Sequence, residues 1–231
     1  MASTLPELFA AAVKRDPGRP FVTFYDDASG ERIELSYATT ANWVAKTANL
    51  LTDELDLATG DTVRIALPPH WLGVAWALAA WSAHATLTST AGDIAIIGPD
   101  DLEDRLEEVR GKSVTVASAL LPLGGRFREP LPPGVVDFGA EVYNHGDLYV
   151  PLDPPRPESP AYDDRTHADL VAAAEPLRER VLTTRDLAND PTTLAGVLAG
   201  GGSVVLCRNL DPATLDRRVA DERVDTVLDR P

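Results

Sequence analysis

Residues 59–85 constrain the fold of this chain more than any other stretch. Within them, residues 62–67 form a short apolar and β-branched run that favours a strand, and the two prolines that follow end it because proline cannot donate to a sheet. From 70 to 83 nearly every residue is apolar, small or aromatic, and three of the chain's four tryptophans lie there. A helix that is apolar on most of its sides is buried. The stretch therefore predicts a strand that leads into the central helix of an α/β core.

Strand and helix signals alternate along the rest of the chain. We expect strands at residues 21–25, 32–35, 94–97, 113–117, 180–184, 203–207 and 224–228, and helices at 6–14, 37–55, 102–110, 166–177, 191–200 and from 211 onward. The polar residues expected to cap these helices are Ser36, Asp100 with Glu103, Thr166 with Asp169, and Asp190. This alternation predicts an α/β fold with a mostly parallel sheet flanked by helices.

Proline and glycine are concentrated between residues 121 and 160. Such a segment is typical of an extended linker or a surface loop. We therefore expect a single α/β domain over residues 1–231, with sub-lobes 1–120 and 161–231 joined by the segment 121–160.

Charge and cysteine content limit the compartment and the partners. The net charge is −15, which disfavours nucleic acid and anionic membranes because binding to phosphate depends on Lys and Arg. No apolar stretch reaches the roughly 18 residues of a membrane span, and the first residues lack the pattern of a signal peptide. The single cysteine, Cys207, allows no internal disulfide and is expected to be buried and inert. We expect a cytoplasmic protein with neither a nucleic-acid nor a membrane partner.

Familiar catalytic motifs are absent from the sequence. Gly111-Lys112-Ser113 resembles the end of a phosphate loop, but Leu106 stands where the loop needs glycine, and a helix precedes it where a strand is required. We interpret Gly111 and the glycines 200–202 as helix C-caps. The four histidines have no metal-ligand spacing, and no G-x-S-x-G elbow exists. The sequence therefore predicts no catalytic residue, no metal and no cofactor.

Residues that follow predicted strands are the candidates for binding a small molecule, because ligands of open α/β sheets bind at that edge. These candidates are His70, Trp71, Arg185, Arg208 and Asn209. The two arginines could hold an anion such as a carboxylate. The structural alternatives, a histidine that caps a helix and two exposed surface arginines, are favoured over binding.

Two long segments carry a resemblance to a known family. Residues 35–85 contain L-S-Y, A-N-L-L, A-T-G-D-T-V-R-I-A and A-L-A-A-W-S-A-H-A in that order, and residues 180–231 contain R-V-L-T-T, L-A-G-G-G-S-V-V-L and L-D-P-A-T-L-D. Their order resembles the N-terminal part of the adenylate-forming enzymes, which include acyl-CoA synthetases, peptide-synthetase adenylation domains and luciferases. The resemblance implies part of the N-terminal α/β domain of that family.

The sequence departs from the family where the family binds phosphate. There the family carries a loop rich in Ser, Thr and Gly that ends in Pro-Lys, whereas residues 149–170 here read YVPLDPPRPESPAYDDRTHADL, with no glycine and no lysine. Only Thr166-His167 resembles the segment after that loop, and Asp163 and Asp164 would repel phosphate. The family's adenine-binding motif, ribose-binding Asp, hinge and C-terminal Lys domain have no counterpart. No catalytic residue is carried over from the resemblance.

Three hypotheses follow from this pattern. The first is a degenerate, non-catalytic adenylate-forming-like protein that acts as an interaction or regulatory domain. The second is a small-molecule binding protein for an acyl or nucleotide ligand, or an unrecognised enzyme, and the third is one half of a split AMP-forming ligase. A protein partner, a second copy of the chain or the segments 121–136 and 150–160 would cover the apolar surface left where the family continues.

Overall fold

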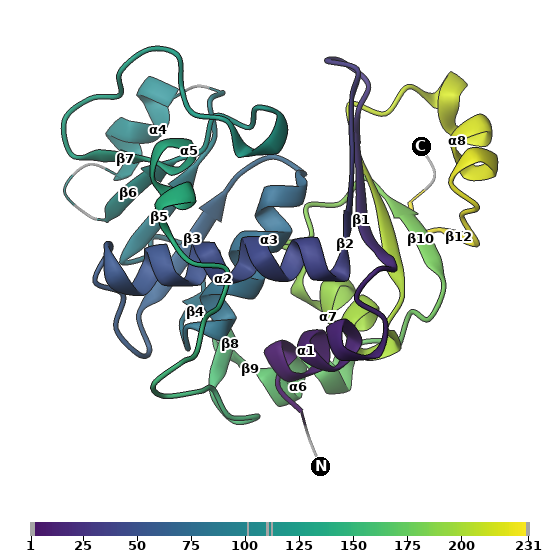
Figure 1. The fold of residues 1–231 in the computed structure, drawn as a ribbon, viewed down its shortest axis with the longest axis horizontal. Helices are drawn as coiled ribbons and strands as arrows, with labels where there is room; N and C mark the ends of the chain where they lie inside the picture. The colour runs from purple at the N-terminus through teal and green to yellow at the C-terminus, as the bar shows by residue number, and fades with distance from the viewer. Residues whose placement is uncertain (1–2, 101, 110, 112, 230–231) are drawn as a thin grey trace.

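The computed structural model describes residues 3–100, 102–109, 111 and 113–229, and their strands form two sheets (Figure 1). The first sheet has the order β12 (Thr226–Val227), β10 (Arg180–Thr183), β11 (Ser203–Arg208), β1 (Pro20–Asp26) and β2 (Glu31–Ser36). The second has the order β7 (Val135–Asp137), β6 (Val114–Ala117), β5 (Ile94–Ile97), β3 (Thr62–Ala66), β4 (Thr86–Leu87), β8 (Pro160–Tyr162) and β9 (Arg165–Thr166). Every pairing is parallel except β1 with β2 and β8 with β9, so the predicted α/β fold with mostly parallel strands is confirmed.

Helices cover both sheets, and α2, α6 and α7 begin at their predicted caps. They are α1 (Leu5–Arg15), α2 (Tyr37–Asp53), α3 (Trp71–Ser82), α4 (Leu102–Val109), α5 (Phe138–Glu141), α6 (His167–Ala173), α7 (Pro191–Gly200) and α8 (Leu215–Asp221), with 3-10 turns at Pro122–Gly124, Val142–Asn144 and Pro212–Thr214. Ser36 caps α2, Thr166 forms a capping box with Asp169 at α6, and Asp190 caps α7. The expected capping box of Asp100 and Glu103 spans residue 101, and the expected end of that helix at 110 also lies outside the described residues.

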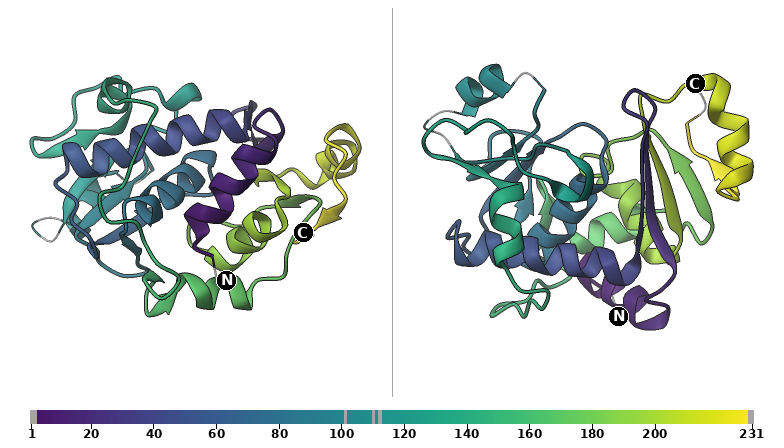
Figure 2. Two further views of the ribbon diagram at one scale, coloured as in Figure 1. Left: turned by 60° about the horizontal axis from the view of Figure 1, so that its bottom comes forward. Right: turned by 45° about the horizontal axis from the view of Figure 1, so that its top comes forward.

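The apolar helix α3 is the centre of the core, as its sequence predicts. Its residues from Trp71 to Trp81 are all buried. Trp71 packs edge-on against Trp43 of α2 with ring centres 5.0 Å apart, and Trp76 contacts Phe138 of α5 at 4.9 Å. Figures 1 and 2 show α2 lying across α3 in the middle of the molecule, with α1, α6 and α7 below them in Figure 1. Within the described part of the chain, none of the helices combines the length and the apolar character needed to cross a membrane.

Strands from distant parts of the chain share the first sheet. β1 and β2 come from residues 20–36, whereas their neighbours β11, β10 and β12 come from residues 180–227. β1 pairs with β11 from Val22 opposite Val204 to Asp26 opposite Arg208. The division into sub-lobes 1–120 and 161–231 stays a prediction, and this sheet joins strands from both ranges.

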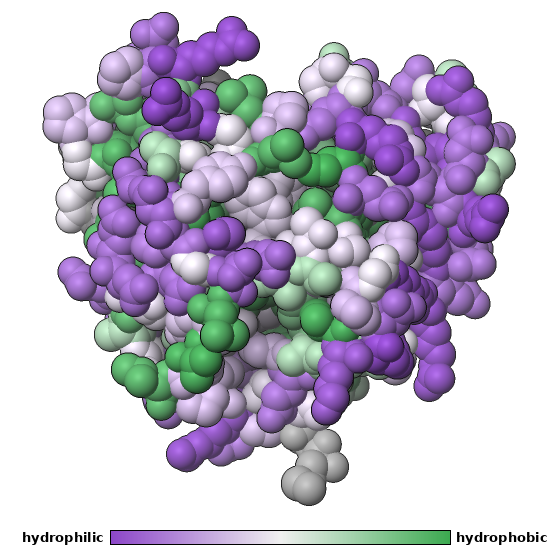
Figure 3. Space-filling view, viewed as in Figure 1, coloured by the Kyte–Doolittle hydropathy of each residue, from purple (hydrophilic) through white to green (hydrophobic). Residues whose placement is uncertain are grey.

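The proline-rich segments 121–136 and 150–160 both contact the body of the protein. In the first, Gly124 packs on the ring of Trp43. In the second, the carbonyl oxygen of Asp153 and the hydroxyl of Ser159 lie 3.1 and 2.9 Å from the two ring nitrogens of His84. Leu148, Val150 and Leu152 are nevertheless 78, 73 and 104% exposed. Figure 3 shows the apolar patches on this face of the molecule.

The predicted helix at 166–177 is wrong at its end, because α6 stops at Ala173. The residue before a proline avoids helical geometry, and Pro176 follows Glu175. The chain then runs extended along α7, where the N–H of Leu177 donates to the carbonyl oxygen of Gly196 at 2.8 Å. The short strands β4, β7, β8 and β9 and the single turn α5 were not predicted, because segments this short carry no periodic signal.

Candidate functional site

The carboxyl ends of the parallel strands in the two sheets lie on the same side of the molecule. Arg208 at the end of β11 forms an ion pair of 2.6 Å with Asp100, which follows β5 in the second sheet. In the loop before α7, Asn189 Nδ2 donates to the carbonyl oxygen of Ile65 in β3 at 2.9 Å. Figure 3 shows the surface notched at the top, beside the free end of the β1–β2 hairpin. Two clefts open along this edge, and ligands of α/β proteins bind at such an edge.

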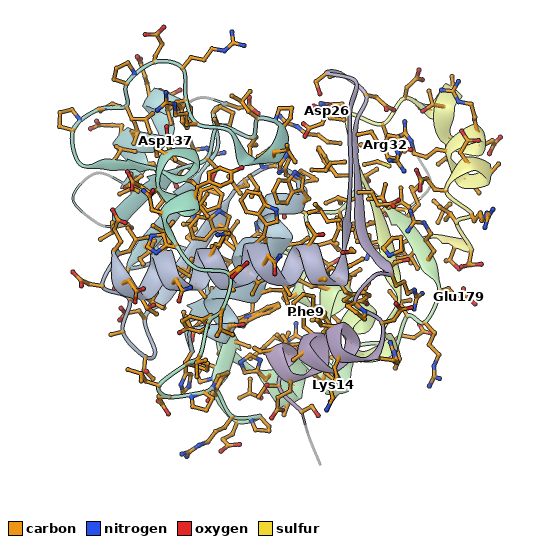
Figure 4. All side chains as sticks on the ribbon, in the orientation of Figure 1. Phe9, Lys14, Asp26, Arg32, Asp137 and Glu179 are labelled. Atoms are coloured by element: carbon orange, nitrogen blue, oxygen red, sulfur yellow. The ribbon has the colours of Figure 1, made fainter. Side chains whose placement is uncertain are left out.

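The first cleft, here named the hairpin cleft, has a volume of about 450 Å³. It is lined by Asp26 and residues 29–33 of the β1–β2 hairpin, by His70, by residues 120–123 and by Arg208. Figure 4 shows Asp26 and Arg32 in the upper part of that hairpin. One wall is apolar (Ile33 and residues 120–123), and the rest carries charged or polar groups.

His70 is the most deeply buried polar residue of the hairpin cleft, with 2% of its surface exposed. It is the N-cap of α3, and its Nδ1 accepts a hydrogen bond of 3.1 Å from the N–H of Leu72. Burial, with a smaller effect of Arg208, lowers the pKa of His70 to about 3, although Asp26 opposes this shift. The ring is therefore neutral at physiological pH. Because Nδ1 is an acceptor, the proton of the neutral ring resides on Nε2.

Two carboxyl groups of the hairpin differ sharply in their environment. Asp26 accepts hydrogen bonds from the N–H of Ala28, the hydroxyl of Ser29 and Nδ2 of Asn209, and these bonds outweigh burial and lower its pKa. Among the described residues, Oε1 of Glu31 has no hydrogen-bond partner, although it is buried. Burial and the charge of Asp26 raise the pKa of Glu31, although Arg208 opposes this shift.

Backbone strain gathers at the same cleft. Leu120 and Leu123 have φ angles of 53° and 56°, and Asn209, next to Arg208, has a φ of 50°. Leucine rarely adopts this left-handed conformation, which costs on the order of 1–3 kcal/mol for each residue. The surrounding structure therefore holds the apolar wall of the hairpin cleft in a fixed shape.

The second cleft, here named the Tyr162 cleft, has a volume of about 500 Å³. It is lined by residues 64–68 and by Ser89, Gly98, Asp100, Arg105, Tyr162 and Asn189. At its rim, Asp163 forms the turn between β8 and β9, with a φ of 50°. The carboxylate of Asp163 accepts from the N–H and hydroxyl of Ser89, both at 2.9 Å, and from the hydroxyl of Thr88 at 3.2 Å. These bonds, that of the Ser89 N–H above all, lower the pKa of Asp163 and keep it ionised.

The structure separates the five residues predicted to bind a ligand. His70 and Arg208 both line the hairpin cleft. Asn209 is not part of this lining, but its Nδ2 donates a hydrogen bond of 2.8 Å to Asp26. Trp71 is 1% exposed and packs in the core, whereas Arg185 lies in the loop between β10 and α7 and pairs with Asp190 at 3.3 Å. Neither arginine is a free anion ligand, since Arg208 is paired with Asp100.

The sequence did not single out Asp26 or Glu31 as site residues. Their segment was interpreted as a plain hairpin turn. Asp26 joins the site because β1 pairs with β11, which brings it next to Asn209, 183 residues away in the sequence. No local pattern signals a pairing over such a separation. The burial expected for Cys207 is confirmed, since this side chain is 0% exposed. That burial raises the pKa of its thiol, so a reactive thiolate is disfavoured.

A relative of similar length is found in Mycobacterium tuberculosis (strain ATCC 25618 / H37Rv), described as a TIGR03089 family protein. The two sequences are 38% identical over 242 residues, and the match covers 97% of this chain and 100% of the relative. No protein-family model matches the chain.

Solved structures with the same fold are adenylate-forming enzymes. An acyl-CoA synthetase from Brucella canis matches with a TM-score of 0.79 at 17% identity, covering 97% of this chain and 47% of that one. Coronafacic acid ligase from Pectobacterium brasiliense matches with a TM-score of 0.77 at 12% identity, covering 97% and 49%. The N-terminal domain of FACL13 from Mycobacterium tuberculosis matches with a TM-score of 0.73 at 13% identity, covering 97% and 62%. The chain thus spans about half the length of the first two structures and has the fold of the N-terminal part of these enzymes.

Proposed function

This chain belongs to the TIGR03089 family, and we propose that it is a non-catalytic interaction or regulatory protein that keeps the adenylate-forming fold without adenylation chemistry. The observation that carries the proposal is the position of Asp163. Its carboxylate accepts hydrogen bonds from the N–H and hydroxyl of Ser89 and from the hydroxyl of Thr88, at the rim of the Tyr162 cleft. A phosphate group would need donors of this kind, and here the chain satisfies them with its own anion.

The composition of the same region supports the proposal. Residues 149–170 take the place of the phosphate loop in the family resemblance, and they contain no glycine and no lysine. Two short strands, β8 and β9, form a hairpin there whose turn is Asp163-Asp164. Both turn residues are exposed. A nucleotide phosphate at this turn would meet two carboxylates rather than backbone N–H groups and an ammonium.

Titration with Mg-ATP tests the proposal directly. A ligand that binds only the folded state stabilises it by RT ln(1 + [L]/Kd), so millimolar ATP would raise the melting temperature clearly if its affinity were micromolar. We expect no change in the melting temperature of this chain. A complete acyl-CoA synthetase, melted in the same buffers, serves as the positive control. A dose-dependent rise would overturn the proposal.

A matched pair of substitutions tests whether Asp163 is the structural anchor of the turn. Asp163→Asn removes the charge that strengthens three hydrogen bonds, and we expect it to lower the free energy of unfolding by about 1 kcal/mol. Asp164→Asn, the neighbouring carboxylate in the same turn, is expected to change it by less than about 0.5 kcal/mol. Equal effects of the two variants in urea denaturation would remove the basis for treating Asp163 as a built-in substitute for phosphate.

A further inference from the structure

The hairpin cleft contains two buried polar atoms whose hydrogen bonds are not satisfied within the described chain. They are Nε2 of His70 and Oε1 of Glu31. A buried polar atom without a partner costs about 1–3 kcal/mol, so native proteins rarely retain two of them in one place unless something else completes the bonds. Other described side chains also carry a buried atom without a partner, but Glu31 and His70 are the two of them that line the same cleft.

We propose that the hairpin cleft binds a small neutral molecule that carries a primary amide on an apolar body. The inference is separate from the proposed lack of nucleotide chemistry, since it concerns a different cleft and different residues. The volume of the hairpin cleft, about 450 Å³, lies within the range of small-molecule sites.

The hydrogen-bonding roles of the two atoms fit a primary amide. Nε2 of His70 carries the ring's proton, because Nδ1 accepts from Leu72, and so Nε2 requires an acceptor. Oε1 of Glu31 requires a donor as long as the carboxyl group is ionised. A primary amide offers both, its carbonyl oxygen to His70 and its NH₂ group to Glu31. A carboxylate has no proton for Glu31, and an ammonium group has no acceptor for His70.

The charges around the cleft leave little to attract an anion. Arg208 is held by Asp100 at 2.6 Å, and Arg32 is held by Glu222 at 2.8 Å. Asp26 is satisfied by its three donors. A charged ligand would have to break one of these arrangements, whereas a neutral ligand leaves them intact.

The apolar wall accounts for the rest of the ligand. Leu121 and Leu123 are 37 and 62% exposed, and Ile33 and Leu120 lie beside them in the lining. Covering such surface contributes roughly 25 cal/mol per Å². The surrounding structure keeps Leu120 and Leu123 at their strained φ angles, so this wall is formed before a ligand arrives.

Benzamide, benzoate and benzylamine form a probe series that differs only in the polar group. Each is titrated into the full chain, and binding is followed by chemical-shift changes of the histidine ring and leucine methyl signals. We expect benzamide to bind with a dissociation constant about tenfold or more below those of the other two, since that factor corresponds to about 1.4 kcal/mol. Equal binding of all three probes would overturn the amide assignment. No binding of benzamide would mean that only water satisfies the two atoms, and the proposal would fail.

Two variants and a control locate the binding. Glu31→Ala removes the acceptor at a partly exposed position, and His70→Asn keeps an oxygen that can cap α3 but removes the Nε2 donor. Each is expected to weaken benzamide binding about tenfold. Glu158→Ala makes the same change on the exposed loop before β8, outside the cleft lining, and should leave binding unchanged. If His70→Asn fails to fold, Glu31→Ala alone decides the outcome. Unchanged binding by Glu31→Ala would overturn the proposal.

Discussion

Arg218 fastens α8 to the first sheet through a nearly buried charge. Its side chain is 7% exposed, and Nη2 and Nη1 donate to the two carboxylate oxygens of Asp27 at 2.5 and 3.2 Å. The guanidinium also lies 4.2 Å from the ring centre of Tyr25. Removing one partner of a buried pair leaves the other charge without compensation, so Arg218→Ala should lower the free energy of unfolding by about 3 kcal/mol. Urea denaturation measures this change.

The neighbouring Arg217 provides the control for Arg218. It lies on the same helix but is exposed. Arg217→Ala removes the same charge and should change the free energy of unfolding by less than about 0.5 kcal/mol. If both substitutions cost the same, net charge rather than the contact with Asp27 would explain the loss.

Glu222 should make the stability of the protein depend on pH in the acid range. Burial of its carboxyl group opposes ionisation, but hydrogen bonds from Tyr25, Arg32 and Arg180 outweigh burial and lower its pKa from 4.5 to about 2. A depressed folded pKa stabilises the native state above the unfolded pKa, and the contribution is lost as the pH falls from about 4.5 toward 2. Glu222→Gln should therefore be less stable than the wild type at neutral pH, by up to about 3 kcal/mol.

The gap between the wild type and Glu222→Gln should close as the pH falls from 4.5 toward 2. Comparing the two proteins at each pH isolates this group from the other carboxylates, which titrate equally in both. Unfolding free energies at neutral pH and at several acid pH values measure the gap. A gap that stays constant across the acid range would contradict the assignment.

At the scale of the elements, α7 carries Gly196 in its interior, a residue that helix propensity disfavours there. The helix interior favours Ala over Gly by about 1 kcal/mol. A Cβ atom at Gly196 would lie 2.5 Å from the carbonyl oxygen of Glu175, in the extended segment that runs along α7. Gly196→Ala should therefore reduce the stability by more than about 2 kcal/mol, because the backbone of that segment must move. Thermal or urea unfolding measures the loss.

Gly73 in α3 is the matched control for Gly196. A Cβ atom there would lie 3.5 Å from Cβ of Ala188, an ordinary contact. Gly73→Ala should be neutral or stabilising by up to about 1 kcal/mol. A stable Gly196→Ala protein would mean that residues 174–177 do not pack along α7 as described.

The same segment shows where sequence prediction succeeds and where it ends. The long strands and helices were found because their apolar period and caps are local, as Ser36 at α2 and Asp190 at α7 illustrate. The end of α6 was missed although Pro176 is a local signal for it, whereas the extended path that follows depends on the contact of Leu177 with Gly196, between distant elements. In the hairpin cleft, His70 and Arg208 were proposed from the sequence because they follow strands, and their role as ligand-binding residues stays a prediction, whereas Glu31 joins them only through the pairing of β1 with β11. Local patterns carry no information on that pairing.

At the scale of the whole molecule, the two sheets share one core. The core cluster includes Phe24 and Val204 of the first sheet, Ile65 and Ile96 of the second, and Trp76 of α3 between them. Such shared packing predicts that the chain unfolds as one cooperative unit rather than as sub-lobes 1–120 and 161–231.

The chain contains its own probes of unfolding in each of the ranges 1–120 and 161–231, so no mutation is needed. The four tryptophans all lie in α2 and α3, within residues 1–120. The single cysteine, Cys207, is 0% exposed and packs with Leu215 of α8, within residues 161–231. In a urea series, tryptophan fluorescence and the reactivity of Cys207 toward a thiol reagent should change at the same midpoint. Labelling of Cys207 at a lower urea concentration would mean that the packing of α8 on β11 opens before the core around the tryptophans, and the chain would then not unfold as one cooperative unit.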